Sequence, residues 1–219
     1  MTQLGILMLD TRFPRPPGDI GHPATFDFVV RRAVVRGASA QRAVRDADPA
    51  LLQPFVEAGL ALVEGGATAI TTSCGFLVLH QQALQAALPV PVWTSSLLAL
   101  PALQARGRAG VVTVDAAALG PAHLCAAGAA ADTPIEGLAP GSAFQRTLLD
   151  DETTLDMDDA RRETVAAAGR LVTRWPDLQA IVLECTNMPP YADAVRRATG
   201  REVHDITTWL AQRLRAAND

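Results

Sequence analysis

Two short apolar runs, each ending in a cysteine, constrain the fold of this chain more than any other feature. Residues 67–70 lead through hydroxyl side chains to Cys74, and residues 180–183 lead through an acidic residue to Cys185. Short apolar runs bounded by polar residues are typical of buried strands. Two thiols at equivalent strand ends, 111 residues apart, predict two halves of one site.

The rest of the chain alternates short strands with helices. Apolar runs bounded by polar, glycine or proline residues predict strands at 4–9, 28–35, 67–73, 90–93, 110–115, 135–138, 180–185 and 202–206. Helical periodicity and capping residues predict helices at 49–64, 77–88, 97–106, 116–127, 158–175, 190–198 and 208–216, with a loop or short helix at 139–155. This alternation predicts parallel sheets with right-handed crossovers.

The strand pattern also repeats. An offset of 111 residues places Cys74 on Cys185, and an offset of 105 places Asp10 on Asp115. We therefore predict an α/β fold of two similar halves with parallel sheets, related by pseudo-twofold symmetry, with the active site in the cleft between them. The predicted N-terminal half is residues 1–106 and the C-terminal half is residues 107–219. The helix that closes the first half could pack on either one.

Composition excludes several classes of protein. A net charge of -4 without a basic run argues against a nucleic-acid partner, and no apolar stretch approaches the ~18 residues of a membrane span. Three cysteines without a CxxC or HxxxH pair argue against a disulfide framework and a structural zinc site. The N-terminus has no signal-peptide pattern, so we expect a cytoplasmic protein. The expected partner is a small molecule. No interface stripe is evident, and a homodimer is left open.

Paired thiols suit one kind of chemistry. Ligands of parallel sheets bind beyond the carboxyl ends of the strands, where both Cys74 and Cys185 are expected. A thiolate on one side of a carbon can remove its proton while a thiol opposite returns one, which inverts that carbon. A free cysteine has a pKa of about 8.5, so one thiol must be activated. Asp10 and Asp115, at strand ends, could order or accept protons.

Small polar residues near the cysteines are candidate donors to a substrate carboxylate. They are Thr72, Ser73, Gly75, Ser95, Ser96, Thr186 and Asn187, and Phe76 ends the first cysteine stretch. Ser95 and Ser96 equally suit helix capping. Arg12 could be a carboxylate clamp or a solvated charge. The proline-rich loop at 13–23 is expected to border the site. Cys125 is expected to pack on an alanine-rich helix, and the four histidines to be surface or capping residues.

These motifs resemble the aspartate/glutamate racemase superfamily, which includes cofactor-independent racemases, hydantoin racemase, arylmalonate decarboxylase and maleate isomerase. The resemblance rests on Thr71-Thr72-Ser73-Cys74 and Glu184-Cys185-Thr186 at the ends of apolar strands in repeated halves. It implies two-base catalysis by both cysteines without pyridoxal phosphate or metal. It also implies a substrate carboxylate held by Gly75, Thr186 and Asn187, and site positions at Asp10, Thr11 and the turn that contains Ser39. Two retained cysteines favour a racemase over the decarboxylase.

Two positions depart from the glutamate racemases. Those enzymes have Asn after the first cysteine, where this chain has Gly75, and His after the second Cys-Thr, where it has Asn187. Asn cannot act as an acid or base in place of that His. The expected substrate is therefore another small carboxylate or amino acid, with aspartate as one option.

The leading hypothesis is a cofactor-independent racemase or epimerase. One alternative is a lyase or cis–trans isomerase of the same superfamily in which one cysteine attacks covalently. Another is a ligand-binding or regulatory protein that keeps the fold without the activity.

Overall fold

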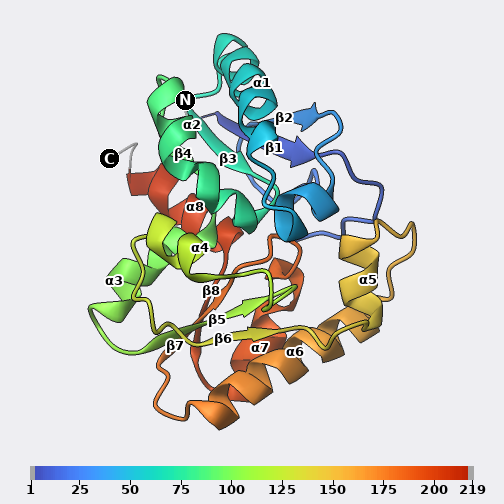
Figure 1. Cartoon of the computed structure of the whole chain (residues 1–219), viewed down its shortest axis with the longest axis vertical. Coiled ribbons are helices and arrows are strands. Elements are labelled where there is room, and N and C mark those ends of the chain that lie inside the picture. Colours follow the sequence, from blue (N-terminus) through green and yellow to red (C-terminus); the bar gives the residue numbers. More distant parts are fainter. Residues whose placement is uncertain (1–2, 217–219) are drawn as a thin grey trace.

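The computed structural model describes residues 3–216 and contains two parallel sheets (Figure 1). The first sheet has the order β2-β1-β3-β4 and the second has the order β6-β5-β7-β8, so the two share one topology. The strands are β1 (Leu4–Leu9), β2 (Val30–Val35), β3 (Ala69–Thr72), β4 (Val92–Trp93), β5 (Ala109–Thr113), β6 (Ile135–Gly137), β7 (Ala180–Leu183) and β8 (Glu202–His204). The predicted α/β fold of two similar halves is confirmed.

Helices connect the strands of both sheets. The α-helices are α1 (Leu52–Glu64), α2 (Gln81–Ala87), α3 (Leu100–Gln104), α4 (Pro121–Ala126), α5 (Ala143–Leu149), α6 (Met157–Arg174), α7 (Ala192–Thr199) and α8 (Ile206–Ala216). Short 3₁₀-helices lie at η2 (Pro49–Leu51), η3 (Gly75–His80), η4 (Ser96–Ala99) and η5 (Pro189–Tyr191), and a short π-helix at η1 (Gln41–Arg45). None of the helices within residues 3–216 is long and apolar enough to cross a membrane.

Several boundaries differ from the prediction. The second strand begins at Val30, two residues later than expected. The helix expected at 116–127 covers only α4, because Pro121 occupies its first turn after the extended Gly120. The π-helix η1 was not predicted at all. At the last helix the cap is Asp205, whose Oδ1 accepts the N–H groups of both Thr207 and Thr208.

The helix after β3 also starts earlier than predicted, and this matters for the site. Instead of beginning at residue 77, the chain turns into η3 at Gly75, directly after Cys74. The first cysteine therefore occupies the position just before a helix N-terminus, which brings backbone N–H groups toward its sulfur.

The final segments of each half cross to the other half. Segment η4 contacts β7, α3 contacts β5, and α8 contacts η4. Figure 1 shows α3 beside the second sheet and α8 beside the first. Ser96 Oγ donates to the Leu183 carbonyl oxygen over 2.8 Å, and the rings of Trp93 and Trp209 meet edge to face at 6.1 Å. The predicted division near residues 106–108 falls between the sheets and stays a prediction.

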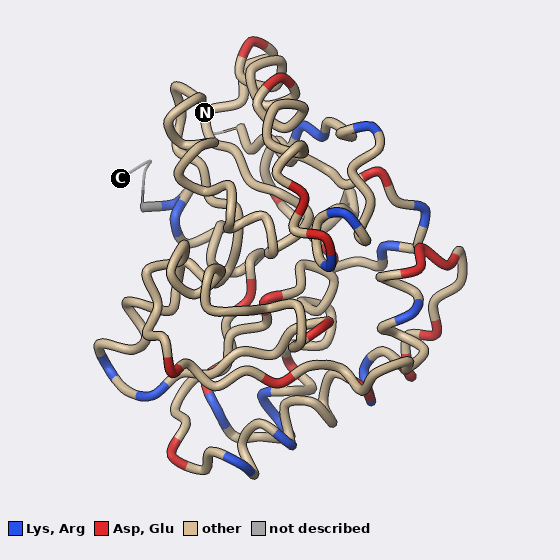
Figure 2. The backbone as a smooth tube through the Cα atoms, viewed as in Figure 1, with Lys and Arg blue, Asp and Glu red and all other residues tan. Residues whose placement is uncertain are grey.

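Charge is spread over the outside of the molecule. The 19 basic residues are all arginine, and Figure 2 shows them alternating with acidic residues around the trace rather than gathering on one face. Most of the ion pairs that the arginines form are exposed, and each contributes little stability. The informative charges are therefore the buried ones.

Candidate active site

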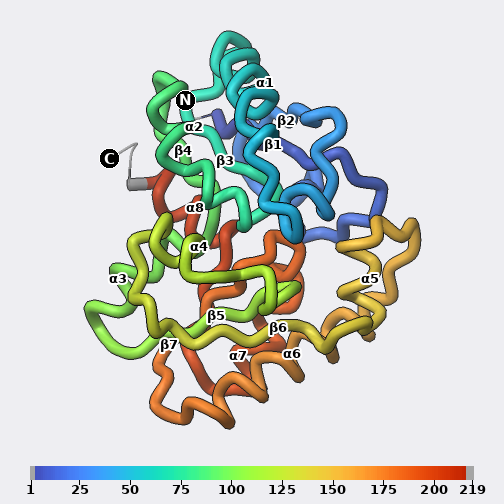
Figure 3. Tube along the Cα trace, in the orientation of Figure 1, coloured from blue at the N-terminus to red at the C-terminus, as the bar shows by residue number. Residues whose placement is uncertain are grey.

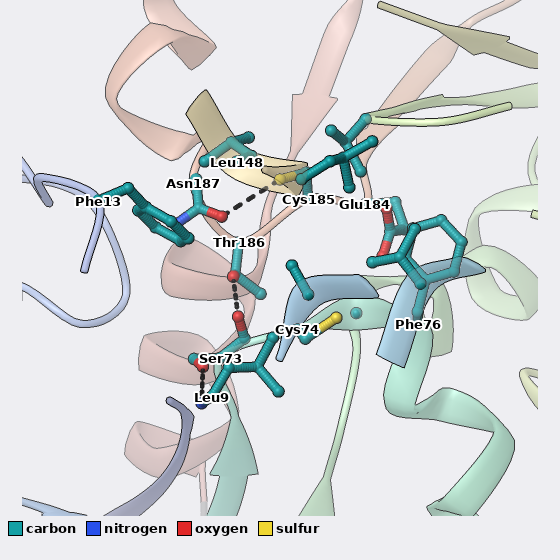
Figure 4. Close-up of a pocket in the computed structure, with 15 residues that line it drawn as sticks. Leu9, Phe13, Ser73, Cys74, Phe76, Leu148, Glu184, Cys185, Thr186 and Asn187 are labelled. Atoms are coloured by element: carbon teal, nitrogen blue, oxygen red, sulfur yellow. Dashed lines mark hydrogen bonds between the residues drawn. The ribbon is translucent and has the colours of Figure 1, made fainter. Parts of the chain in front are cut away.

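A pocket lies where the carboxyl ends of β1 and β3 face those of β5 and β7. The space between its lining atoms, including the part that is open to solvent, is about 360 Å³. The lining residues are Leu9, Phe13, Ala40, Val44, Ser73, Cys74, Gly75, Phe76, Val114, Leu148, Leu149, Glu184, Cys185, Thr186 and Asn187, drawn in Figure 4. Both halves contribute, as expected for a site between two sheets.

Both predicted cysteines line this pocket, and both are nearly buried, with exposed fractions of 7% for Cys74 and 6% for Cys185. Each follows a central strand of its sheet. The structure therefore brings together the two thiols that the sequence separates by 111 residues. Their catalytic role stays a prediction.

Burial sets the protonation of these thiols. Desolvation raises the pKa of Cys74 to about 12, with a further contribution from the nearby Glu184 carboxylate. Backbone N–H groups of Phe76 and Leu77 act in the opposite direction. Burial, and then Glu184, also raise the pKa of Cys185 well above its usual value. Both thiols are therefore protonated at neutral pH in the empty pocket.

Glu184 is the residue that the sequence analysis did not assign. Its side chain is fully buried, and Oε2 accepts a hydrogen bond from Thr113 Oγ1 over 2.7 Å. Within residues 3–216, its Oε1 has no hydrogen-bond partner. Burial raises the pKa of this carboxyl to about 8. The available signal was an acidic residue closing an otherwise apolar strand, next to the second cysteine.

Gly75 has a steric explanation. A Cβ atom built on Gly75 would lie 2.3 Å from Glu184 Oε1 and 2.5 Å from the Glu184 carbonyl oxygen. No side chain fits there unless the backbone moves. The departure from the glutamate racemase pattern at this position thus follows from the close approach of the two halves.

A chain of hydrogen bonds links Cys185 to the loop after β1. The Cys185 thiol donates to Asn187 Oδ1 over 3.5 Å, and Asn187 Nδ2 donates to Asp19 Oδ2 over 2.6 Å. Asp19 is buried and forms an ion pair with Arg15 over 3.0 Å. The side chain of Asn187 is therefore held in one orientation, with its oxygen toward the thiol.

The loop at 13–23 borders the site, as the sequence analysis expected. Phe13 lines the pocket, as do Leu148 and Leu149 of α5. Asp151, just after α5, accepts the backbone N–H groups of Arg12 and Phe13. Figure 3 shows the blue loop after β1 meeting this yellow segment. Together they cover one side of the pocket.

Seven of the predicted substrate-binding and catalytic positions line the pocket. In two of them, Ser73 and Thr186, the side-chain hydroxyl forms a hydrogen bond with the protein framework. Thr186 Oγ1 donates to the Ser73 carbonyl oxygen over 2.7 Å, and Ser73 Oγ accepts the N–H of Leu9 over 2.8 Å. These bonds join β1, β3 and the second cysteine stretch. The seven positions are Ser73, Cys74, Gly75, Phe76, Cys185, Thr186 and Asn187.

The structure does not bring the other candidates into the pocket lining. Asp10 Oδ2 accepts the N–H of Gly37, and Thr11 Oγ1 accepts a bond from Arg15. The Arg12 side chain is 74% exposed and pairs with Asp151.

The remaining hydroxyl candidates also have structural partners. Ser39 Oγ accepts the N–H of Arg42, and Thr72 Oγ1 donates to the Thr94 carbonyl oxygen. Ser95 caps η4 by accepting the N–H of Leu97, as the capping alternative expected. Ser96 joins the two halves through Leu183. These side chains support the framework around the pocket.

Two further expectations concern isolated residues. Cys125 lies on α4 as predicted, but it is exposed rather than packed. His123 Nδ1 accepts the N–H of Gly120, so it caps α4, yet the side chain is buried with its ring edge to face against Phe76 at 5.2 Å. Among residues 3–216, no three His, Cys, Asp or Glu side chains are placed to hold a metal ion.

Comparison with known proteins identifies relatives of this chain. No family model matches it. It is 31% identical to dimethylsulfoniopropionate lyase of Durusdinium sp. clade D over 214 residues, which are 92% of this chain and 70% of that protein. It is 30% identical to dimethylsulfoniopropionate lyase 7 of Emiliania huxleyi, covering 99% of this chain and 67% of that protein.

Solved structures show the same fold at lower identity. Arylmalonate decarboxylase matches with a TM-score of 0.66 at 17% identity, covering 97% of this chain and 92% of that one. Allantoin racemase from Klebsiella pneumoniae matches with a TM-score of 0.63 at 15% identity, covering 100% and 89%. The chain therefore belongs to the family of the dimethylsulfoniopropionate lyases, and it shares its fold with arylmalonate decarboxylase and allantoin racemase.

Proposed function

We propose that this protein is a cofactor-independent lyase that eliminates a leaving group from a small carboxylate, with dimethylsulfoniopropionate as the candidate substrate. The observation that supports this most is the match to lyases named for that substrate along 92% of the chain. The pocket is consistent with it, because two thiols and one carboxyl lie among apolar side chains. This replaces racemisation, the leading hypothesis from sequence, with the lyase alternative.

The chemistry needs one strong base and a good leaving group. A thiolate of Cys74 or Cys185 takes the proton from the carbon next to the substrate carboxylate. The electron pair of that C–H bond forms a carbon–carbon double bond as the bond from the β carbon to sulfur breaks. Sulfur keeps the pair and leaves as neutral dimethyl sulfide, and acrylate remains. The thiol then returns its proton to solvent. Positioned proton transfer of this kind contributes typically about 10²–10⁴-fold.

Substrate binding assists the base. Burial, and then the neighbouring Glu184 carboxylate, raise the pKa of both thiols and favour their protonated forms. A positively charged sulfonium group in the same pocket stabilises a thiolate by charge attraction. The sulfonium group of the zwitterionic substrate thus lowers the pKa of the thiol that lies next to it.

The test is direct measurement of product. Purified protein is incubated with dimethylsulfoniopropionate, dimethyl sulfide is measured by gas chromatography, and acrylate by chromatography. Stoichiometric release of both supports the proposal. Absence of both at millimolar substrate, with folded protein, rejects it.

Racemisation is a second candidate, favoured by one observation: two thiols rather than one line the pocket. It predicts exchange of an α proton for deuterium in heavy water without loss of a leaving group, and inversion seen by chiral chromatography. The lyase alternative of the sequence analysis used covalent attack by one cysteine, whereas the lyase proposed here uses a cysteine as a base. Covalent attack predicts a mass increase on that cysteine after substrate is trapped.

A further inference from the structure

Glu184 occupies an unusual position for an acidic side chain. It is fully buried in the wall of the pocket, Thr113 satisfies only its Oε2, and within residues 3–216 its Oε1 accepts no hydrogen bond. A buried acceptor without a donor typically costs about 1–3 kcal/mol, and more when it is charged. The folded protein tolerates this arrangement, and because Oε1 is enclosed beside Gly75, a ligand in the pocket interacts with it through charge rather than through a hydrogen bond.

The surroundings of Oε1 indicate what kind of ligand that is. Among residues 3–216, the pocket lining contains no Arg, Lys or His side chain, and Glu184 is its one carboxylic acid. Phe76 lines the same end of the pocket in Figure 4. Gly75 leaves the space that the carboxyl fills. Once the carboxyl is ionised, above its pKa of about 8, its anionic oxygen in an apolar pocket suits a cation that has no hydrogen to donate.

We propose that Glu184 is the specificity-determining residue of this pocket and that it recognises an onium group, a sulfonium or quaternary ammonium centre, on the substrate. This proposal rests on the proposed function, because it takes the ligand of this pocket to be a small carboxylate. An onium centre interacts with Oε1 by charge alone. A neutral carbon isostere of the same shape leaves Oε1 unpaired and loses that attraction.

The arrangement of the pocket fixes how such a ligand lies. Figure 4 shows Glu184 and Phe76 at one end, Asn187 and Phe13 at the other, and the two cysteine sulfur atoms between them. With its onium group at Glu184, a ligand directs its carboxylate away from that carboxyl, toward Asn187. The carbons between the onium group and the carboxylate then lie next to the thiols, which is where a proton must be removed.

The experiment compares two ligands that differ only in charge and cannot undergo β-elimination. Dimethylsulfonioacetate has its sulfonium on the α carbon, and 3-methylbutanoate is its neutral carbon isostere. Isothermal titration calorimetry at pH 9, where the Glu184 carboxyl is ionised, measures both affinities for the wild type, Glu184→Gln and Glu184→Asp. The wild type is expected to bind the sulfonium at least about tenfold more tightly, a difference of about 1.4 kcal/mol. Glu184→Gln is expected to reduce this ratio to within about twofold of unity, and Glu184→Asp to retain part of it.

Internal controls separate recognition from folding. Affinity for 3-methylbutanoate should be the same in the wild type and Glu184→Gln, which shows that the pocket is intact. Glu202→Gln makes the same chemical change at an exposed carboxylate on β8, outside the pocket lining, and should keep the full ratio. A wild type without preference for the sulfonium, or a Glu184→Gln variant that keeps it, overturns the proposal.

The two proposals fail in different ways. Dimethyl sulfide release by a wild type that binds both ligands equally would reject the role of Glu184 and keep the lyase. A charge preference that depends on Glu184, without release of dimethyl sulfide, would keep the onium site and reject the lyase.

Discussion

The two halves of the molecule have the same strand order, but the residues that flank the cysteine differ between them. At equivalent positions the first half contributes Ser73-Cys74-Gly75-Phe76 and the second contributes Glu184-Cys185-Thr186-Asn187. Ser73 satisfies its hydroxyl within its own sheet, through Leu9, whereas Glu184 reaches the pocket with one oxygen unpaired. The duplicated framework thus places the two thiols at equivalent positions, whereas the residues next to each thiol differ between the halves.

The largest expected effect concerns Glu184 and its counterpart Ser73. Burial raises the pKa of Glu184 in the folded protein to about 8, above the value of about 4.3 expected in the unfolded chain. Between these pH values the folded state holds a proton that the unfolded state has lost, so the free energy of unfolding falls as pH rises. The full loss above pH 8 is at most about 5 kcal/mol. Urea unfolding from pH 5 to 9 should show this decline, and Glu184→Gln should flatten it.

Ser73→Ala is the matched change in the first half. It leaves the buried N–H of Leu9 without its acceptor, which costs about 1–3 kcal/mol at every pH.

For Glu184→Gln, a pH dependence of the unfolding free energy as steep as that of the wild type would show that the Glu184 carboxyl titrates normally in the folded protein.

The next largest effect tests whether the two thiols are equally needed. Cys74→Ala and Cys185→Ala should each lower kcat for dimethyl sulfide release. Replacing the cysteine that acts as the base should lower kcat by about 10³-fold, which is about 4 kcal/mol in activation free energy. The residue with the larger loss is the base of the elimination. Cys125→Ala, at an exposed thiol on α4, should be indistinguishable from the wild type. Full activity in either pocket variant would exclude that thiol from the reaction.

Gly75 and its counterpart Thr186 should respond differently to alanine. In Gly75→Ala the new Cβ meets both the carboxyl and the backbone oxygen of Glu184, so overpacking should cost about 1–3 kcal/mol and disturb the pocket. Thr186→Ala loses one hydrogen bond to Ser73, which costs about 0.5–1.5 kcal/mol. Thermal and urea unfolding measure both. A Gly75→Ala variant as stable as the wild type would show that the halves separate easily at this point.

The smallest expected effect is at Arg12. Its side chain is largely exposed and pairs with Asp151, so Arg12→Met should change the free energy of unfolding by less than about 1 kcal/mol. The structure places Arg12 outside the pocket lining, so KM for dimethylsulfoniopropionate should change by less than about threefold, because a surface pair contributes little to binding. A rise in KM of tenfold or more would restore Arg12 as a carboxylate clamp.

The sequence alone determined the architecture and the two thiols. Apolar runs of strand length alternate with helical stretches, and this local pattern depends little on tertiary context. The repeat of a cysteine after the third strand of each half was visible because both strands are buried on both faces and therefore continuously apolar. Helix ends were less predictable, because a local residue such as Asp205 or Pro121 decides them.

Only the tertiary structure decided the character of the pocket. Hydroxyl groups that suited a carboxylate site in the sequence, those of Ser39, Thr72 and Ser96, form hydrogen bonds with the framework instead. The unpaired oxygen of Glu184 and the need for glycine at position 75 arise from one contact between residues 109 positions apart. Local sequence encodes which strands form, whereas the burial of a charge and the space beside it depend on how closely the two halves approach.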